Sequence, residues 1–353
     1  MAHSFVPIGP QEATLAPSVH HRRLVERTTP RLGFTEGADV TTWQADLRGE
    51  LGPMVAIPEK RGPLEARTEW RLDTTWGTVE RIRFHAEPGA DVVGYLCLPR
   101  SGPDPASGAY PVMICLQGHS SGAHNSIGRA YHDESTVIDV PGDRDFAVEA
   151  CRRGYAALCL EQRSFGQRAE WTQPRVSDYM CLDTSLQALL LGRTLLGERL
   201  LDVDRGIDYL DQRGDIDMSR IGLMGNSGGG VVTMYGAALL DRIAFAMPSC
   251  AFCTFDSSLM SVYHCACNYI PGLLTVAEAA DVTGLFAPKP IVIVAGRTDP
   301  VFPLHGVEAG FASLQRIYAA AGAPDRCRLV IGEGGHRFYA EQGWNELGEL
   351  LAR

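Results

Sequence analysis

Short runs of consecutive apolar residues alternate with segments of helical periodicity along most of this chain. Six runs have the length of buried strands: 112–116, 155–160, 221–224, 244–251, 291–295 and 327–331. The segments with helical spacing are 146–153, 185–210, 231–239, 307–321 and 339–351. Strands that are apolar on both faces and alternate with helices predict an α/β fold, in which helices cover both sides of a mostly parallel sheet.

Two further strands are predicted ahead of these runs. Residues 79–85 alternate between apolar and polar positions, and residues 92–98 form another apolar run. The turn between them contains Pro88 and Gly89, which is typical of a hairpin. With the six runs they make a sheet of about eight strands, and we interpret residues 75–353 as one α/β domain.

Residues 1–74 are more polar and carry scattered Pro and Gly. One helix is expected at 39–51, where four large apolar residues follow helical spacing. We therefore expect an N-terminal extension, partly helical, that packs on the α/β domain. Two segments of that domain, 120–144 and 254–284, are expected to form lid-like walls of a pocket.

A serine motif follows one of the central strands. Residues 225–229 read Gly-Asn-Ser-Gly-Gly, and the helix predicted after them is amphipathic over 231–239. A G-x-S-x-G sequence between a strand and a helix is typical of a sharp turn that exposes the serine hydroxyl at the carboxyl end of the sheet. Ser227 is therefore the candidate nucleophile. The alternative is a glycine-rich turn without chemistry.

A serine hydroxyl needs a base to take its proton and an acid to orient that base. In proteins with this motif the acid and then the base follow the serine along the chain. Asp299 comes after the run 291–295 and His336 after the run 327–331, so they complete a triad with Ser227. One further acid and two further bases remain as alternatives: Asp256, His264 and His305.

Backbone N–H groups near the serine would stabilise the negative charge of an oxyanion. The N–H of Gly228 follows the serine, and the loop after 112–116 supplies a second donor at His119. The His119 ring could instead contact substrate or pack the loop. Candidate substrate-binding residues come from the same loop and from the aromatic segment after 244–251: Gln117, Ser120, Phe252, Tyr263 and Tyr269.

The 353-residue chain has 32 Lys and Arg against 42 Asp and Glu, a formal net charge of −10, and is 45% hydrophobic. This hydrophobic share excludes global disorder, and the acidic balance disfavours nucleic-acid binding. No membrane span is expected, because the apolar stretch 186–201 contains three charged residues. The N-terminus lacks the basic and apolar regions of a secretory signal, so we expect a cytoplasmic protein.

Ten cysteines are spread along the chain, and several lie in apolar runs, as is typical of reduced, buried thiols. A zinc site is an alternative interpretation of five residues in one segment: Cys250, Cys253, His264, Cys265 and Cys267. Cys250 ends an apolar run, however, and a C-x-C pair is uncommon in structural zinc sites. We therefore expect no metal and no cofactor, and interpret this segment as a pocket wall.

Six segments of the sequence together resemble those of a known protein family: QGHSSG (117–122), CRRGY (151–155), LEQRSFGQR (160–168), RIGLMGNSGGG (220–230), VAGRTDPVFP (294–303) and GEGGHRFY (332–339). With these segments in this order, the chain resembles the α/β-hydrolase superfamily over about residues 75–350. Within it, the chain is similar to the dienelactone-hydrolase-like and acetyl xylan esterase/cephalosporin C deacetylase branch. The resemblance implies the triad and oxyanion donors named above. Glu161-Gln-Arg163-Ser stands where that branch usually has Asp-x-Arg-Gly, and Gln117 replaces a more common His.

These features predict a serine hydrolase that cleaves an acetyl ester or a similar small acyl ester through an acyl-enzyme. The expected partner is a small-molecule ester, and a homo-oligomer is left open. Two alternative enzymes use the same triad: a lactone- or dienelactone-type hydrolase, and an amidase or peptidase. An alternative of another class is a ligand-binding protein that has the fold of a hydrolase and no catalysis.

Overall fold

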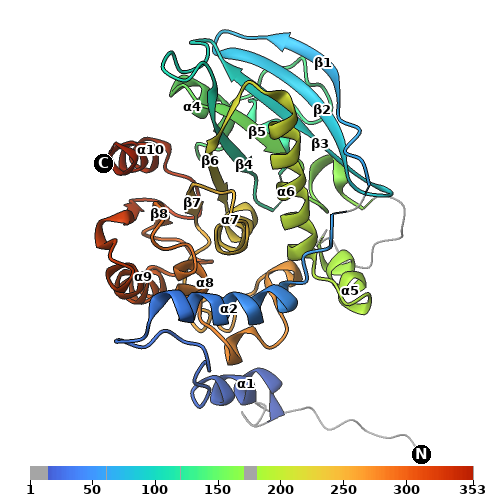
Figure 1. Ribbon diagram of the computed structural model, residues 1–353. Helices are drawn as coiled ribbons and strands as arrows, with labels where there is room; N and C mark the ends of the chain where they lie inside the picture. The colour runs from blue at the N-terminus through green and yellow to red at the C-terminus, as the bar shows by residue number, and fades with distance from the viewer. Residues whose placement is uncertain (1–14, 61, 120, 171–180, 353) are drawn as a thin grey trace, which may run out of the picture.

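The computed structural model describes residues 15–60, 62–119, 121–170 and 181–352, which fold around one nine-stranded sheet (Figure 1). The strands are β1 (Arg67–Asp73), β2 (Gly77–Glu87), β3 (Ala90–Pro99), β4 (Tyr110–Leu116), β5 (Ala156–Leu160), β6 (Ile216–Asn226), β7 (Phe245–Ser249), β8 (Ile291–Gly296) and β9 (Cys327–Gly332). Their order across the sheet is β1-β2-β3-β5-β4-β6-β7-β8-β9. Strands β4 to β9 run parallel, whereas β1, β2 and β3 are antiparallel to their neighbours. The predicted parallel sheet with a preceding hairpin is confirmed, with one strand more than expected.

The additional strand, β1, lies at the edge of the sheet and pairs with β2. Its sequence, RTEWRLD, contains no apolar run, and six of its seven residues are exposed. An edge strand with charged side chains is held by its backbone hydrogen bonds, so the hydrophobic pattern does not reveal it. Through β1, residues 67–73 of the expected N-terminal extension belong to the sheet of the main domain.

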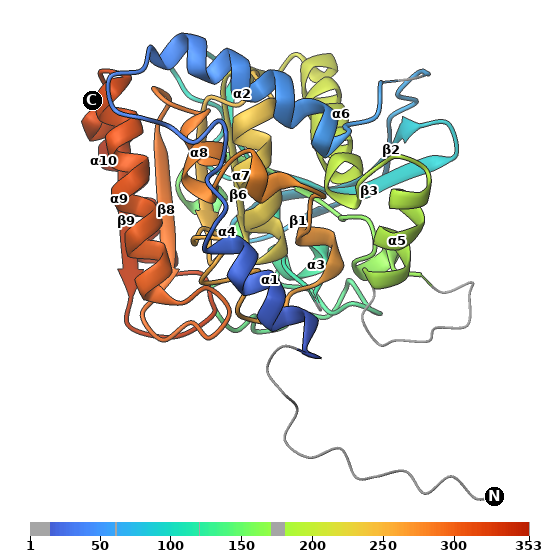
Figure 2. The same cartoon turned by 90° about the horizontal axis from the view of Figure 1, so that it is seen from below.

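Helices cover both faces of the sheet (Figures 1 and 2). They are α1 (Pro17–Val25), α2 (Val40–Val55), α3 (Ala123–Ser126), α4 (Phe146–Arg152), α5 (Leu182–Leu190), α6 (Leu195–Arg213), α7 (Gly228–Leu239), α8 (Ala279–Gly284), α9 (Leu304–Ala320) and α10 (Ala340–Leu351). Helices α6 to α9 contribute to one buried apolar cluster, and α4 and α10 to the other. Ile114 and Leu116 of β4 face the first cluster, and Met113 and Cys115 face the second, as the alternation of side chains along a strand requires.

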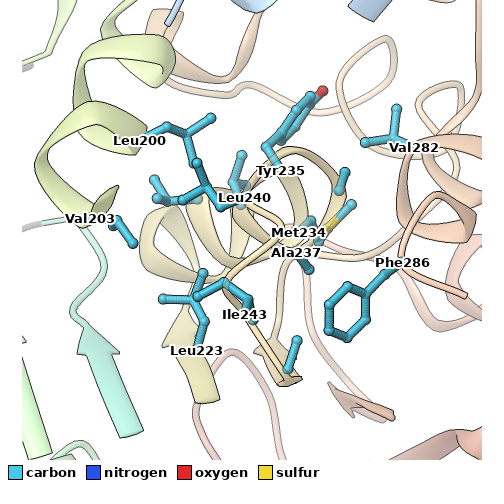
Figure 3. Close-up of a cluster of buried hydrophobic side chains, with 14 of the residues drawn as sticks. Leu200, Val203, Leu223, Met234, Tyr235, Ala237, Leu240, Ile243, Val282 and Phe286 are labelled. Carbon is cyan, nitrogen blue, oxygen red and sulfur yellow. The ribbon is translucent and has the colours of Figure 1, made fainter. Parts of the chain in front are cut away.

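Helix α7 differs from its prediction. The sequence pattern suggests an amphipathic helix, but residues 228–238 are all buried. The helix packs against β6 and β7 on one side and against α6 and α8 on the other. Figure 3 shows Met234 and Tyr235 of α7 between Leu200 of α6 and Val282 of α8. A helix enclosed in this way is apolar all round, and α7 contains no charged residue.

The N-terminal helix α2 lies across the helices of the main domain (Figure 2). The buried side-chain amide of Gln44 donates to the carbonyl oxygens of Gly284, at 3.0 Å, and Ala287, at 2.8 Å. The carboxylate of Asp281 accepts the backbone N–H of Phe34 at 2.8 Å. These hydrogen bonds join the N-terminal segment to α8. None of the helices in the described ranges is long and apolar enough to cross a membrane.

The expected lid-like segment 254–284 ends in the core. All six residues of α8 are buried, and the helix packs against α7 and α9. The side chains of Glu278 and Asp281 cap its first turn reciprocally, which satisfies N–H groups that have no partner within the helix. This part of the predicted lid is therefore a packed helix, because its sequence consists mainly of small and apolar residues.

Candidate active site

Ser227 lies in the turn between β6 and α7. Its backbone has φ 57° and ψ −121°, a conformation that is uncommon for residues other than glycine. Such strain is typical of a turn that presents a side chain at a functional site. The turn also requires close packing, since a Cβ on Gly229 would lie 2.1 Å from the carbonyl oxygen of Leu116. The glycine pattern around Ser227 therefore has a steric reason.

Asp299, which follows β8, contacts His336, which follows β9. The Nδ1 atom of His336 lies 2.8 Å from Oδ2 of Asp299. The other carboxylate oxygen accepts the backbone N–H groups of Val301, at 2.8 Å, and Phe302, at 3.1 Å. Burial alone would raise the pKa of Asp299, but the hydrogen bond from His336, its charge and the two N–H donors hold that pKa below its usual range. The arrangement fixes an ionised carboxylate against the imidazole.

Ser227, Asp299 and His336 each follow the carboxyl end of a parallel strand, and these ends lie on the same side of the sheet. Ser227 follows β6, and β7, β8 and β9 come next in order. The N–H of Ser227 donates to the carbonyl of Ser249 on β7 at 2.9 Å. The next residue, Cys250, has its sulfur within 4.8 Å of ligand atoms of Asp299 and His336. Asp299 and His336 thus lie next to Cys250, one residue beyond the strand residue that pairs with Ser227, and direct contact between Ser227 and His336 stays a prediction.

Of the alternative acid and bases, none contacts Asp299 or His336 by a hydrogen bond among the described residues, although His264 packs on Phe302, the ring that stacks on His336. Asp256 is exposed, and His305 is exposed on α9. His264 is buried, with Nε2 2.8 Å from the hydroxyl of Ser258. Burial lowers the pKa of His264, which favours a neutral ring with a packing role. Asp299 is the acid that contacts His336.

The loop after β4 lies against the serine turn. A Cβ on Gly118 would come within 2.9 Å of the Cβ of Ser227, and a Cβ on Gly228 within 2.8 Å of the His119 ring. Gly228 is also the first residue of α7, where backbone N–H groups have no partner inside the helix. Both residues predicted to supply oxyanion donors, His119 and Gly228, are therefore packed around the serine turn.

The residues predicted to bind substrate differ in their surroundings. Ser120 lies outside the described residues. Gln117 is buried, and its amide donates to the Ser126 hydroxyl at 2.8 Å and the Arg144 carbonyl at 2.7 Å. Phe252 is buried in the core against α9. These contacts give Gln117 and Phe252 a packing role in place of the predicted contact with substrate.

The two tyrosines of the predicted pocket wall lie at the surface. Tyr263 is 64% exposed and Tyr269 is 42% exposed. The hydroxyl of Tyr269 donates to the carbonyl of Leu259 at 3.0 Å, which fixes its ring on the segment after β7. Both rings therefore remain open to an approaching molecule.

An apolar cavity adjoins the candidate triad. Its walls come from the start of α7, the segment after β7 and the loop after β8: Val231, Met234, Tyr235, Ala251, Cys253, Phe255, Ser258, Leu259, Asn268 and Phe302. The ring of Phe302 stacks on the ring of His336, with centroids 5.9 Å apart and an interplanar angle of 13°. With a volume of about 20 Å³, the cavity can receive a methyl-sized apolar group from a molecule that contacts His336.

Residues 161–164, where this chain differs from the usual Asp-x-Arg-Gly sequence, form a buried polar network. The carboxylate of Glu161, at the end of β5, accepts the N–H of Ala123 at 3.1 Å and of Gln167 at 3.2 Å, and burial raises its pKa to about 7. Arg163 forms ion pairs with three carboxylates at 3.0 to 3.1 Å: Glu87, Glu198 and Asp202. Arg163 thus takes part in ion pairs even though Glu replaces the usual Asp of this segment.

A cluster of four residues of types that can bind a metal lies beside the oxyanion loop, and only two of them, Cys265 and Cys267, belong to the zinc alternative of the sequence analysis. Ligand atoms of four residues all lie within 4.8 Å of one another: His119, Cys181, Cys265 and Cys267. Cys250, from the zinc alternative, lies with Asp299 and His336 instead. Cys181 belongs to no paired cysteine motif and is distant in sequence, so residue spacing gave no signal for its place in this set.

The sheet order and the strand–turn–helix arrangement at Ser227 are those of the α/β-hydrolase fold, which this chain shares with solved esterases. A crystal structure described as a "putative acetyl xylan esterase" from Bacteroides fragilis NCTC 9343 aligns with a TM-score of 0.72 and 17% identity, covering 93% of this chain and 84% of that one. A glucuronoyl esterase from Solibacter usitatus aligns with a TM-score of 0.61 and 15% identity, covering 92% of this chain and 96% of that one. The fold class predicted from the sequence is confirmed.

A curated protein is also similar in sequence. The Bacillus subtilis (strain 168) protein named "Putative hydrolase YtaP" is 27% identical over 298 residues, which are 83% of this chain and 94% of that protein. No protein-family model matches the chain. The likeness to solved structures, at identities below 25%, establishes the shared fold, and the chemistry has to be argued from the site.

Proposed function

We propose that this chain is a serine carboxylic ester hydrolase. The observation that carries the proposal is the Asp299–His336 hydrogen bond of 2.8 Å, formed beside the strained turn of Ser227. A carboxylate bound to one imidazole nitrogen fixes the tautomer whose other nitrogen can accept a proton. In this arrangement His336 is the base, Asp299 orients it and Ser227 is the nucleophile.

The reaction proceeds in two steps. His336 takes the proton of the Ser227 hydroxyl as its oxygen attacks the ester carbonyl, and the resulting oxyanion accepts hydrogen bonds from the N–H groups of Gly228 and His119. His336 then gives the proton to the departing alcohol, which leaves an acyl group on Ser227. Water, activated by the same base, hydrolyses this acyl-enzyme and restores the serine.

The proposed substrate is an ester of a small acyl group, such as an acetyl ester. The apolar cavity beside Phe302, with a volume of about 20 Å³, has room for a methyl-sized group such as that of an acetyl ester. The exposed rings of Tyr263 and Tyr269 offer surfaces on which a sugar ring can pack. Proteins with this fold include a glucuronoyl esterase and an acetyl xylan esterase, which supports a carbohydrate ester among the candidates.

Turnover of a substrate panel tests this proposal. We expect the wild-type protein to hydrolyse p-nitrophenyl acetate and acetylated sugars faster than lactones or aminoacyl amides, and Ser227→Ala to lose at least about 10³-fold in kcat. Hydrolysis of the esters by Ser227→Ala at the wild-type rate would refute the mechanism. Faster turnover of lactones or amides than of esters would instead correct the substrate class.

A further inference from the structure

Three separate parts of the chain converge at the cysteine–histidine cluster. His119 belongs to the loop after β4, and Cys181 lies immediately before α5. Cys265 precedes the 3-10 turn Ala266–Asn268, and Cys267 lies within it. Nε2 of His119 lies 3.2 Å from the sulfur of Cys267, and all four ligand atoms fall within 4.8 Å of one another. Donors on a tetrahedral zinc ion, with bonds of about 2.0–2.3 Å, are about 3.6–3.8 Å apart, so these four atoms lie close enough together to bind one ion after small side-chain shifts.

A buried positive charge adjoins these sulfurs. Arg199 of α6 is 2% exposed, and its Nη2 lies 3.1 Å from the sulfur of Cys181. Among the described residues, its other hydrogen bonds go to the carbonyl of Arg163, and its guanidinium lies 4.4 Å from the centre of the Phe165 ring. A buried guanidinium needs compensating negative charge, which neither a carbonyl nor a neutral thiol provides. Thiolates beside Arg199 would supply it.

We propose that His119, Cys181, Cys265 and Cys267 bind one structural zinc ion. Three thiolates and a neutral imidazole give the Zn²⁺ complex a net charge of minus one, which the charge of Arg199 balances. Zinc is the divalent metal that such a sulfur-rich tetrahedral donor set favours. Four protein ligands leave no open position, so the ion has a structural role, and on binding the thiol protons pass to solvent.

The ion would hold the oxyanion loop in place, a consequence that rests on the proposed esterase function. His119 contributes its ring to the metal and its backbone N–H to the oxyanion. The neighbouring Nδ1–Cε1 edge of the ring packs against Gly228, where an added Cβ would lie 2.8 Å from Cε1 and Nδ1. A metal bond at Nε2 therefore fixes the loop against the serine turn, in the way that groups behind a metal ligand fix its orientation.

Metal analysis of the full-length protein tests the proposal. Protein expressed with added zinc and purified without chelators should contain about one zinc per chain by mass spectrometry. X-ray absorption of this wild-type protein should show a shell of three sulfurs at about 2.3 Å and one nitrogen at about 2.0 Å. Cys265→Ser and Cys267→Ser should each lower the zinc content at least about fivefold, whereas the matched control Cys253→Ser, from the same segment, should retain it.

Two results would overturn the zinc site. One is wild-type protein with less than about one tenth of a zinc per chain, with free thiols or a disulfide among Cys181, Cys265 and Cys267. The other is an X-ray absorption spectrum of the wild-type protein without the three-sulfur shell. This result would exclude the zinc site even if Cys265→Ser and Cys267→Ser fail to fold. Ser227→Ala should keep its zinc while it loses ester turnover, so failure of the zinc proposal and failure of the esterase proposal give different results.

Discussion

At the scale of single residues, the proposed role of His336 as a base depends on how Asp299 is held. Both of its carboxylate oxygens are engaged, one by His336 and the other by the N–H groups of Val301 and Phe302. These donors keep its pKa low although the group is buried, so the carboxylate remains charged and accepts a hydrogen bond at neutral pH. An ionised acceptor selects the imidazole tautomer that can act as a base toward Ser227.

Replacing this acid should reduce catalysis without removing the site. Asp299→Asn keeps the shape of the side chain but can present an N–H to His336 and so favour the wrong tautomer. We expect kcat for p-nitrophenyl acetate to fall by about 10³–10⁴-fold. The matched control, Asp256→Asn, changes an exposed acid and should leave kcat unchanged. Loss of activity in Asp256→Asn with full activity in Asp299→Asn would show that the acid is wrongly assigned.

The sequence could predict the residues of the candidate triad but only two residues of the proposed zinc site, Cys265 and Cys267, and not the two others, His119 and Cys181. Ser227, Asp299 and His336 each follow an apolar strand, and parallel strands bring their carboxyl ends to one edge of the sheet. Local pattern therefore implies their proximity. Cys181 reaches Cys265 only because α5 packs against the turn Ala266–Asn268, and this contact depends on tertiary packing that no spacing along the chain records.

At the scale of elements, Glu161 joins the end of β5 to two loops. Its carboxylate accepts N–H groups from Ala123, at the start of α3, and from Gln167, in the 3-10 turn Gly166–Arg168. Burial raises its pKa to about 7 from an ordinary 4.5. Between these pH values the folded protein binds more protons at this site than the unfolded chain does. The contribution of Glu161 to stability therefore decreases as the pH rises from about 4.5 to 7.

Glu161→Gln should remove this pH dependence, since the amide is uncharged throughout and its oxygen can still accept from a backbone N–H. The free energy of unfolding in urea, measured at pH 5 and pH 8, should fall more across this range in the wild type than in the variant, by roughly 2 kcal/mol. Glu333→Gln is the control, because Glu333 is exposed and its pKa lies below its usual range. Equal pH slopes in the wild type and Glu161→Gln would contradict this account of Glu161.

The elements that the sequence misjudged share a physical cause. The hydrophobic pattern predicts an element from the spacing of apolar residues within that element. It therefore finds strands such as β4, which are apolar throughout. It misses β1, whose stability comes from backbone pairing at an edge, and it describes α7 as amphipathic although the helix is enclosed by neighbours from distant parts of the chain. Both cases depend on partners that only the assembled sheet supplies.

At the scale of the whole molecule, the candidate site is assembled from loops at one edge of the sheet. The loops after β4, β6, β8 and β9 supply His119, Ser227, Asp299 and His336 respectively. The helices behind them are buried on both faces of the sheet, which gives the loops a rigid support. Placing a reactive serine on such a support is what the α/β-hydrolase fold provides.

The central claim, that Ser227 is the nucleophile, is tested most directly by covalent labelling with a fluorophosphonate. We predict that the intact wild-type protein gains the mass of one phosphonyl adduct and that peptide mapping places it on Ser227, because a serine activated by His336 attacks phosphorus as it attacks an ester. Ser227→Ala should gain no adduct under the same conditions. Equal labelling of wild type and Ser227→Ala, or an adduct mapped to another residue, would contradict the account.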